Sequence, residues 1–312
     1  MKVEYRTDGS LGWIILSNPP YNNLIHPVFA DWTELTEFLA SPDLKAVIIK
    51  GEGRHFCGGA DLDILQAQME NPDVIADAIN QGKSLLKAMA FAPIPLLAMV
   101  KGSCLGGGLE IALACHFRFA SENAMFGFPE AENALMPAFG GSVFTNNVVP
   151  RQSLIDLMLS GRMVRSNEAL AIGLIDRVLP TSKLETAAAE FLGSLTDKRS
   201  PTLIRSVMES IHNGKRLSMD EALRRETELF CRVVRDSHDN AQIHSHLERV
   251  PITDVERDRR RLAADCFSDR EIEELASRRT ATMAGFLAVK KALVSLFVEA
   301  GGHGDSGTYV SD

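Results

Sequence analysis

The sequence lacks both a long hydrophobic segment and an excess of basic residues. No apolar run approaches the ~20 residues that span a bilayer, and Lys2, Glu4 and Arg6 stand where a signal peptide needs its apolar stretch. Lys and Arg number 33 against 41 Asp and Glu, which gives a net charge of −8. Because phosphate binding needs clustered positive charge, we expect no nucleic-acid surface. Because no apolar run is long enough to span a bilayer, we also expect no membrane protein.

Cysteine is scarce as well. The five cysteines are odd in number and scattered through mostly apolar stretches: Cys57, Cys104, Cys115, Cys231 and Cys266. This pattern favours buried, reduced thiols over disulfides or metal ligands. We therefore expect a cytoplasmic protein with no bound metal.

The first half of the chain alternates between two kinds of apolar pattern. Short apolar runs predict strands at 13–17, 46–49, 95–100, 117–120 and 124–126, while helical spacing predicts helices at about 27–39 and 74–89. This alternation is typical of an α/β core with parallel strands.

From about residue 143 onward the pattern is nearly all helical. Apolar residues three or four apart predict helices at 151–160, 167–172, 182–196, 201–213 and 219–236. Beyond about residue 249 the chain becomes dense in charge, and a second apolar stretch follows at 286–298. We predict a core over 1–195, a helical region over 196–249 and a C-terminal extension over 250–312.

Two glycine-rich turns each follow a predicted strand and precede a helix. They are Gly58-Gly59-Ala60-Asp61 and Gly106-Gly107-Gly108-Leu109-Glu110. Glycine lets the backbone approach a ligand closely, and a helix that begins at such a turn has free N–H groups. Two such turns allow two N–H donors to converge on one oxygen, which is the requirement for binding an oxyanion.

Two glutamates lie beside glycine turns. Glu110 ends the second glycine-rich turn, and Glu130 precedes a further glycine turn at 139–141. Taken alone, Glu110 is explained as an acid that stabilises a helix N-terminus, and Glu130 as a solvated loop acid. Both, however, have apolar surroundings, in which desolvation raises the pKa of a carboxyl group toward the range useful for proton transfer. Together they favour a catalytic role.

These segments resemble the enoyl-CoA hydratase/isomerase (crotonase) superfamily. The family carries a GxGxxFxxGAD-type segment, a GxxxGGGxE segment, and a Pro-Glu pair whose glutamate falls twenty positions later. The sequence has GEGRHFCGGAD at 51–61, GSCLGGGLE at 102–110, and Pro129-Glu130. The stretch from 159 to 178 is also similar, and the resemblance covers about residues 3–248.

The resemblance implies a site and a reaction. The N–H groups of Ala60 and Gly107 would bind the thioester oxygen, Glu110 would act as base toward water, and Glu130 would handle the proton at the α carbon. Substrate-binding positions implied by the same motifs are Asn22, Gly59, Asp61, Leu62, Gly106, Phe128, Pro129, Ala134 and Gly140. No cofactor is implied other than coenzyme A as part of the substrate.

The implied fold is a crotonase-like spiral of ββα units with a helical C-terminal region that forms trimers. We therefore expect a homotrimer or homohexamer that binds an acyl-CoA or an acyl-carrier thioester. Ala134 stands where the hydratases commonly have glycine, and Phe128 puts an aromatic ring close to Glu130. Both departures would change the shape of the acyl pocket, so they affect which acyl group fits more than which reaction takes place.

The presence of both glutamates favours a hydratase or dehydratase of fatty acid metabolism. Another crotonase-type reaction (isomerisation, thioester hydrolysis or decarboxylation) is the second reading, and a non-catalytic partner of an acyl carrier protein is the third. Pieces of the extension weakly resemble phosphopantetheinyl transferases, but Lys291 stands where those enzymes have a metal-binding Glu. An amphipathic tail used in oligomer packing is the favoured interpretation, and work on carrier-bound polyketide intermediates is a further hypothesis.

Overall fold

The computed structural model describes residues 1–68, 72–146 and 148–237. The chain divides into two compact units, Met1–Arg216 and Leu217–Asp312. In the second unit the described element is one helix, α10 (Met219–Ser237), which lies at the predicted position. The pieces that resemble phosphopantetheinyl transferases, together with Cys266, lie outside the described residues.

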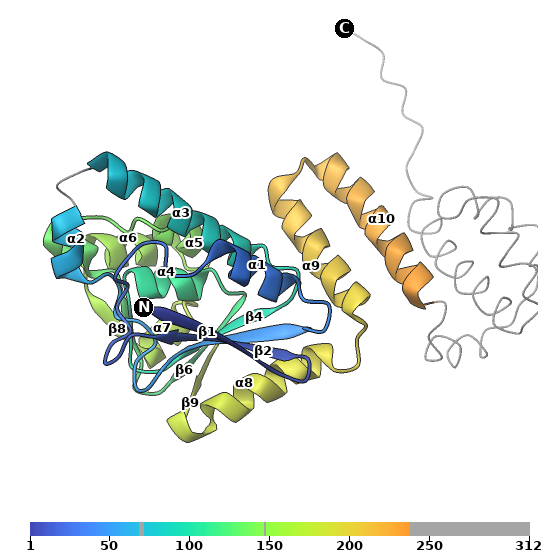
Figure 1. Cartoon of the computed structure of the whole chain (residues 1–312), viewed down its shortest axis with the longest axis horizontal. Helices are drawn as coiled ribbons and strands as arrows, with labels where there is room; N and C mark the ends of the chain where they lie inside the picture. The colour runs from blue at the N-terminus through green and yellow to red at the C-terminus, as the bar shows by residue number, and fades with distance from the viewer. Residues whose placement is uncertain (69–71, 147, 238–312) are drawn as a thin grey trace, which may run out of the picture. The chain divides into compact units, whose positions relative to one another are not determined.

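The first unit is built on a six-stranded sheet (Figure 1). Its strand order is β1 (Lys2–Asp8), β2 (Leu11–Ser17), β3 (Ala46–Gly51), β4 (Leu96–Val100), β6 (Phe117–Ser121) and β9 (Arg177–Leu179). Neighbours from β2 to β9 are parallel, which confirms the predicted α/β core, and β1 runs antiparallel to β2. Strand β1 has no apolar run because it lies at the sheet edge, where a half-exposed strand needs none.

A smaller sheet holds three short strands. They are β5 (Ser103–Leu105), β7 (Met125–Gly127) and β8 (Met163–Arg165). The chain passes from β4 in the large sheet to β5 in the small one and then into helix α4 (Gly107–Leu113); β6 and β7 repeat the step between sheets. This alternation is the expected spiral of strand–strand–helix units, and it returns the chain repeatedly to the edge where the glycine turns lie.

Helices cover both faces of the large sheet. Helix α8 (Thr181–Thr196) packs on one face, where Ala46 and Ile48 of β3 meet Leu184 and Leu192. The alternate residues of β3 belong to a larger core that also includes residues of α1 (Trp32–Ala40), α3 (Pro72–Ala90) and α4. Figure 1 shows these helices on the opposite side of the sheet from α8. Burial on both faces explains why the parallel strands are continuously apolar.

Most predicted helices are present, with two corrections. Helix α1 begins at Trp32 instead of residue 27, because the Asp31 side chain accepts the N–H of Glu34 at 2.9 Å and caps the helix there. The region after residue 143 is not purely helical, since β8 and β9 lie within it. Three residues are too few to show the alternation that identifies a strand.

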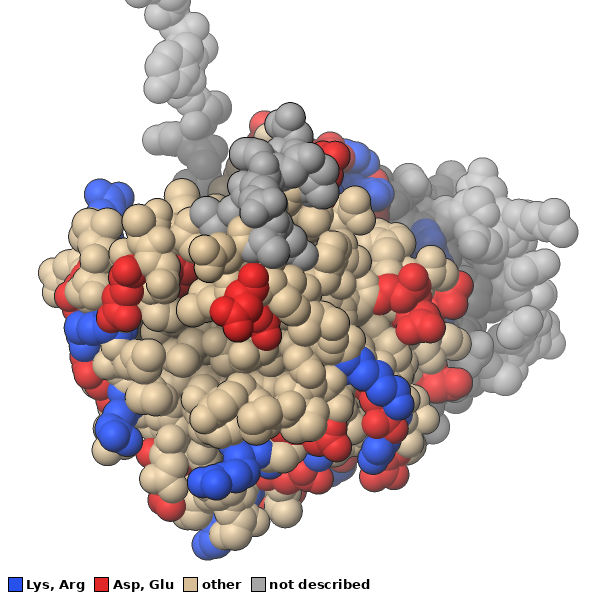
Figure 2. All heavy atoms as spheres, turned by 60° about the vertical axis from the view of Figure 1, so that its left-hand side comes forward, with Lys and Arg blue, Asp and Glu red and all other residues tan. Residues whose placement is uncertain are grey.

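Three of the remaining helices of the first unit lie at the predicted positions: α6 (Arg151–Ser160), α7 (Ser166–Ala171) and α9 (Pro201–Arg216). Helix α2 (Leu62–Gln68) follows the first glycine-rich turn, as expected, whereas the sequence pattern did not predict α5 (Gly141–Thr145). Within the described parts of the chain, no helix is both long and apolar enough to cross a bilayer. Uncharged side chains cover most of the face that carries α2, α5 and α6, broken by a few acidic and basic groups (Figure 2).

Candidate active site

The two glycine turns lie side by side. Cys57 and Cys104 form a parallel bridge, and the N–H of Leu105 donates to the carbonyl of Cys57 at 3.0 Å. Gly59 has a φ of +94°, and a Cβ built on it would stand 2.8 Å from the carbonyl oxygen of Leu105. Only glycine allows this approach. Ala60 and Gly107 consequently line the same pocket.

The N–H groups of Ala60 and Gly107 are left outside the regular hydrogen bonds of their elements. Leu24 donates to the carbonyl of Gly59 at 2.8 Å, and its own carbonyl accepts the N–H of Asp61 at 2.9 Å. In this parallel pairing the N–H of Ala60, between those two residues, points away from Leu24. Gly107 is the first residue of α4, and the first N–H groups of a helix have no partner within it.

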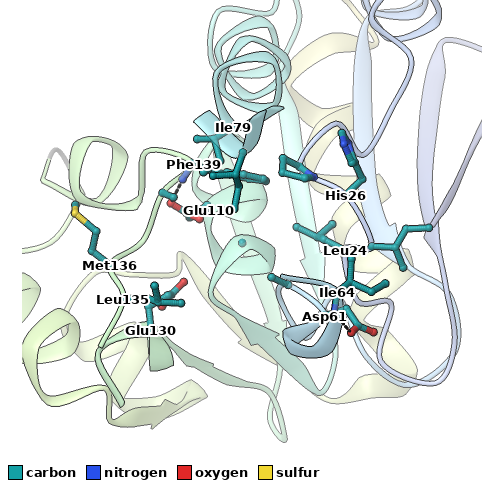
Figure 3. A pocket seen from close by; sticks show the side chains of 16 residues that line it. Leu24, His26, Asp61, Ile64, Ile79, Glu110, Glu130, Leu135, Met136 and Phe139 are labelled. Carbon is teal, nitrogen blue, oxygen red and sulfur yellow. Dashed lines mark hydrogen bonds between the residues drawn. The ribbon is translucent and has the colours of Figure 1, made fainter. Parts of the chain in front are cut away.

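Glu110 is clamped by the backbone. It is the fourth residue of α4 and is only 2% exposed. Its Oε1 atom accepts the N–H of Phe139 at 2.8 Å (Figure 3). The same atom accepts the N–H of Gly141 at 2.7 Å. One carboxylate oxygen is therefore held by two donors, which leaves Oε2 for chemistry.

Two opposing effects act on the pKa of Glu110. The net result is a pKa raised from 4.5 to about 7, with burial as the largest cause and the negative charge of Glu130 acting in the same direction. The N–H groups of Gly141 and Phe139 lower it, as does the positive charge of Lys83. A carboxyl group in this range is suited to accept and return a proton at neutral pH.

Glu130 lies across the pocket, in the first turn of the 3₁₀ helix η1 (Pro129–Asn133). Burial raises its pKa, and its Oε2 atom is buried with no hydrogen-bond partner among the described residues. A Cβ on Gly106 would stand 2.7 Å from Oε1 of Glu130, so the second glycine turn supports this carboxyl group directly. Two carboxyl groups that repel each other in one pocket tend to share a single proton.

The pocket between these groups is mostly apolar, with an empty volume of about 760 Å³. Glu110 and Glu130 face it from different walls (Figure 3). Its lining consists of Leu24, Ile25, His26, Pro27, Ala60, Asp61, Ile64, Ile75, Ile79, Gly107, Glu110, Glu130, Leu135, Met136, Ala138 and Phe139. The apolar walls exclude water from the carboxyl groups and suit an aliphatic acyl group.

Five predicted site residues thus line one pocket: Ala60, Asp61, Gly107, Glu110 and Glu130. Gly59 and Gly106 shape the turns beside it, Leu62 is the exposed first residue of α2, and Pro129 begins η1. Ala134 ends η1 with a φ of +54°, the left-handed conformation that favours glycine, and Gly140 precedes α5 with a φ of +110°.

Phe128 supports the Glu110 clamp instead of lining the pocket. Its side chain is fully buried, and a Cβ on Gly141 would stand 2.9 Å from its Cε1 atom. The ring therefore packs beneath the turn whose N–H groups bind Glu110.

Asn22 is also remote from the pocket lining. It is fully buried with a φ of +57°, and its side-chain amide donates to the carbonyls of Glu52 and His55, both at 2.9 Å. Its Oδ1 atom accepts the N–H of Asn18 at 3.0 Å. Asn22 thus joins the turn after β2 to the loop after β3 and holds the segment that leads to Leu24.

Sequence reasoning missed the two N–H groups that clamp Glu110 and most of the apolar lining. Leu24, Ile79 and Phe139 have the pattern of ordinary core residues, so their side chains gave no signal. The glycine turn at 139–141 was visible, but nothing local indicates which side chain its N–H groups bind. Among the described residues no group of three or more His, Cys, Asp or Glu is arranged to hold a metal ion.

Comparison with known proteins agrees with this geometry. A profile of the enoyl-CoA hydratase/isomerase family matches residues 6–253. A probable enoyl-CoA hydratase of Bacillus subtilis (strain 168) is 28% identical over 253 residues, covering 79% of this chain and 96% of that protein. The fatty acid oxidation complex subunit alpha of Shewanella putrefaciens is 34% identical over 196 residues, which cover 60% of this chain and only 27% of that larger protein.

The fold is shared with solved structures. The crystal structure of an enoyl-CoA hydratase from Polaromonas sp. JS666 superposes with a TM-score of 0.70 at 28% identity, covering 79% of this chain and 97% of that one. The family profile covers well over half of the sequence and includes both glycine turns and both glutamates. The resemblance read from the motifs is confirmed, and the chain belongs to the enoyl-CoA hydratase/isomerase family.

Proposed function

We propose that this protein is an enoyl-CoA hydratase, adding water to the α,β double bond of an acyl thioester or removing it in the reverse direction. One observation carries the proposal: Glu110, Glu130, Ala60 and Gly107 line a single, mostly apolar pocket. By the motif resemblance, the presence of both glutamates favours a hydratase over the isomerases and decarboxylases of the superfamily, which often keep one or neither. The names of the relatives, among them a fatty acid oxidation subunit, support a role in fatty acid metabolism.

The N–H groups of Ala60 and Gly107 stabilise the charge that develops on the thioester oxygen. Adding water at the β carbon pushes an electron pair onto that oxygen and forms an enolate. A pair of N–H donors that is already in position binds the enolate more strongly than the neutral thioester, which lowers the barrier. Each such donor contributes roughly 3–4 kcal/mol.

Glu110 and Glu130 move the protons. The free Oε2 of Glu110 accepts a proton from water while the water oxygen bonds to the β carbon. Glu130, in its protonated form, donates its proton to the α carbon as the enolate collapses. One proton has entered Glu110 and one has left Glu130, so the pair is restored by exchange with solvent. A single proton shared by the pair is the state in which this cycle begins.

The test is the loss of enoyl-thioester ultraviolet absorbance with a panel of short-chain enoyl-CoAs. Glu110→Gln and Glu130→Gln should each lower kcat by roughly 10²–10⁴-fold, the contribution of a positioned acid or base. Glutamine at position 110 still offers an oxygen to the N–H groups of Phe139 and Gly141, so the fold is kept. Glu132→Gln is the matched control, because Glu132 is an exposed residue of the same 3₁₀ helix that does not line the pocket.

A folded wild-type protein that binds CoA thioesters but leaves the absorbance unchanged would overturn the hydratase proposal. Product analysis would then separate the other readings: a shifted double bond indicates isomerisation, free CoA indicates thioester hydrolysis, and release of CO₂ indicates decarboxylation. Binding with no product of any kind would favour a non-catalytic carrier partner.

The remaining proposals concern the carrier of the acyl group, the cofactor, the location and the assembly of the protein. We expect coenzyme A or an acyl carrier to be part of the substrate, no separate cofactor, a cytoplasmic location, and assembly into a homotrimer or homohexamer. Exposed apolar side chains on α5, α6 and β8 support assembly: Val143, Ile155, Leu159 and Met163.

A further inference from the structure

The side chain of Phe139 forms part of the pocket wall next to Glu110. It is 8% exposed, lines the pocket, and lies beside Ile79 and Glu110 (Figure 3). Its backbone N–H holds Oε1 of Glu110. The ring is therefore fixed next to the catalytic carboxylate, and any residue at this position would keep the N–H while changing the wall.

The ring fills the gap between the second glycine turn and helix α3. A Cβ on Gly107 would stand 4.0 Å from its Cδ2 atom, and a Cβ on Gly82 of α3 would stand 3.4 Å from its Cζ atom. A methyl group added at either glycine would therefore reach the ring in ordinary van der Waals contact, so the ring stands close to both backbones and lies between them.

Helix α3 cannot be displaced easily to make room. A Cβ on Gly82 would stand 2.6 Å from the carbonyl oxygen of Pro27, so the helix already packs against the backbone of the loop that precedes α1. Three other lining side chains are exposed: Ile25 by 44%, Ile64 by 36% and Met136 by 68%. The pocket thus reaches solvent at these side chains, whereas the Phe139 ring is buried in its wall.

We propose that Phe139 sets the acyl-chain specificity of this protein, making its substrates short, unbranched, apolar enoyl thioesters. The inference rests on the function proposed above. An acyl chain whose thioester oxygen lies at Ala60 and Gly107 meets the Phe139 ring within a few carbons, because the ring stands beside Gly107. Longer chains have to leave the pocket again and gain no further apolar contact.

The test is the affinity for saturated acyl-CoAs, from butanoyl-CoA to decanoyl-CoA, measured by isothermal titration calorimetry. These compounds carry no double bond, so binding is measured without turnover. Each methylene that is newly buried improves affinity by about fourfold. For the wild type we expect affinity to stop rising at the short end of the series. For Phe139→Ala we expect it to continue rising by about fourfold per methylene over several more carbons.

Two further variants make the outcome decisive. Phe139→Leu keeps a large apolar side chain and should extend the series less than alanine does, which covers the case in which Phe139→Ala folds poorly. Leu170→Ala removes an exposed apolar side chain of α7 that does not line the pocket, and it should leave the dependence on chain length unchanged. The same dependence in wild type and both Phe139 variants would overturn this inference while the hydratase proposal stands. Failure of the wild type to bind any member of the series would overturn the proposed function itself.

Discussion

Replacing Gly141 with alanine tests whether the backbone clamp sets the working pH of Glu110. The new Cβ would stand 3.0 Å from Oε1 of Glu110, 2.9 Å from Cε1 of Phe128 and 3.0 Å from Cβ of Pro137. With neighbours on three sides, the turn has to shift by a few tenths of an ångström. The 2.7 Å hydrogen bond from the Gly141 N–H to Glu110 is the contact that this shift weakens.

The size of the effect follows from that hydrogen bond. A hydrogen bond to a charged group contributes about 1.5–3 kcal/mol, and about 1.4 kcal/mol corresponds to one pH unit. Because the N–H lowers a pKa that burial has raised to about 7, weakening the bond raises it further. With a rise of about one pH unit, the ionised fraction of Glu110 at pH 7 falls from about a half to about a tenth. Activity at pH 7 should fall about fivefold and recover at alkaline pH.

The assay is the pH dependence of kcat for hydration of a short-chain enoyl-CoA, from about pH 6 to pH 10. The acid limb of the profile should move to higher pH in Gly141→Ala. Gly214→Ala is the control, because nothing lies within 4 Å of the position its Cβ would take, and its profile should match the wild type. An equal loss of activity at every pH would show that the clamp fixes position only, and the argument about the pKa would be refuted.

Three further predictions concern residues around and behind the site. Burial lowers the pKa of His116 from 6.5 to about 4, with its Nδ1 accepting the N–H of Leu96 at 2.9 Å. Because the pKa of His116 is lower in the folded protein, the unfolded chain binds a proton at His116 at a higher pH than the folded protein does. The free energy of unfolding should therefore fall by about 3 kcal/mol as the pH drops from 6.5 to 4. Urea unfolding should show this loss in the wild type and a flatter dependence in His116→Asn; equal slopes would contradict it. Gly106→Ala should displace Glu130, whose Oε1 lies 2.7 Å from the new Cβ, and lower kcat by about 10²-fold or more with little change in CoA affinity, as seen by calorimetry. Asn22→Ala should lower the free energy of unfolding by about 2–4 kcal/mol, because the carbonyls of Glu52 and His55 lose their donor and alanine is unfavourable at this left-handed position. An unchanged midpoint with weaker CoA binding would instead support a direct substrate role.

The sequence determined those features that local pattern encodes. Continuous apolar strands alternating with helices specify a parallel sheet buried on both faces, and this core was found as expected. The glycine turns were recognisable because close backbone approach leaves only glycine possible, as at Gly59. Strand β1 and the three-residue strands β5, β8 and β9 were not predicted, because edge position and short length remove the periodic signal.

The two glutamates were likewise visible in the sequence, but their relation to each other was not. They are twenty positions apart, and the passage through β6 and β7 brings Glu130 back to the turn at Gly106. Burial of that shared pocket raises both pKa values. Desolvation depends on everything packed around a group, so its extent at one residue is a property of the assembled fold.

Only the tertiary structure decided what surrounds the reacting groups. The N–H groups that hold Glu110 belong to Phe139 and Gly141, and a backbone donor leaves no mark on residue identity. Asn22 matched a motif by its position, but the fold directs its amide to the carbonyls of a neighbouring loop. Phe139 has the pattern of a core residue, and the fold makes it part of the pocket wall beside Gly82 of α3. The sequence thus specified the candidate catalytic groups and their order along the chain, while long-range packing set their distances, their solvation and the size of the pocket.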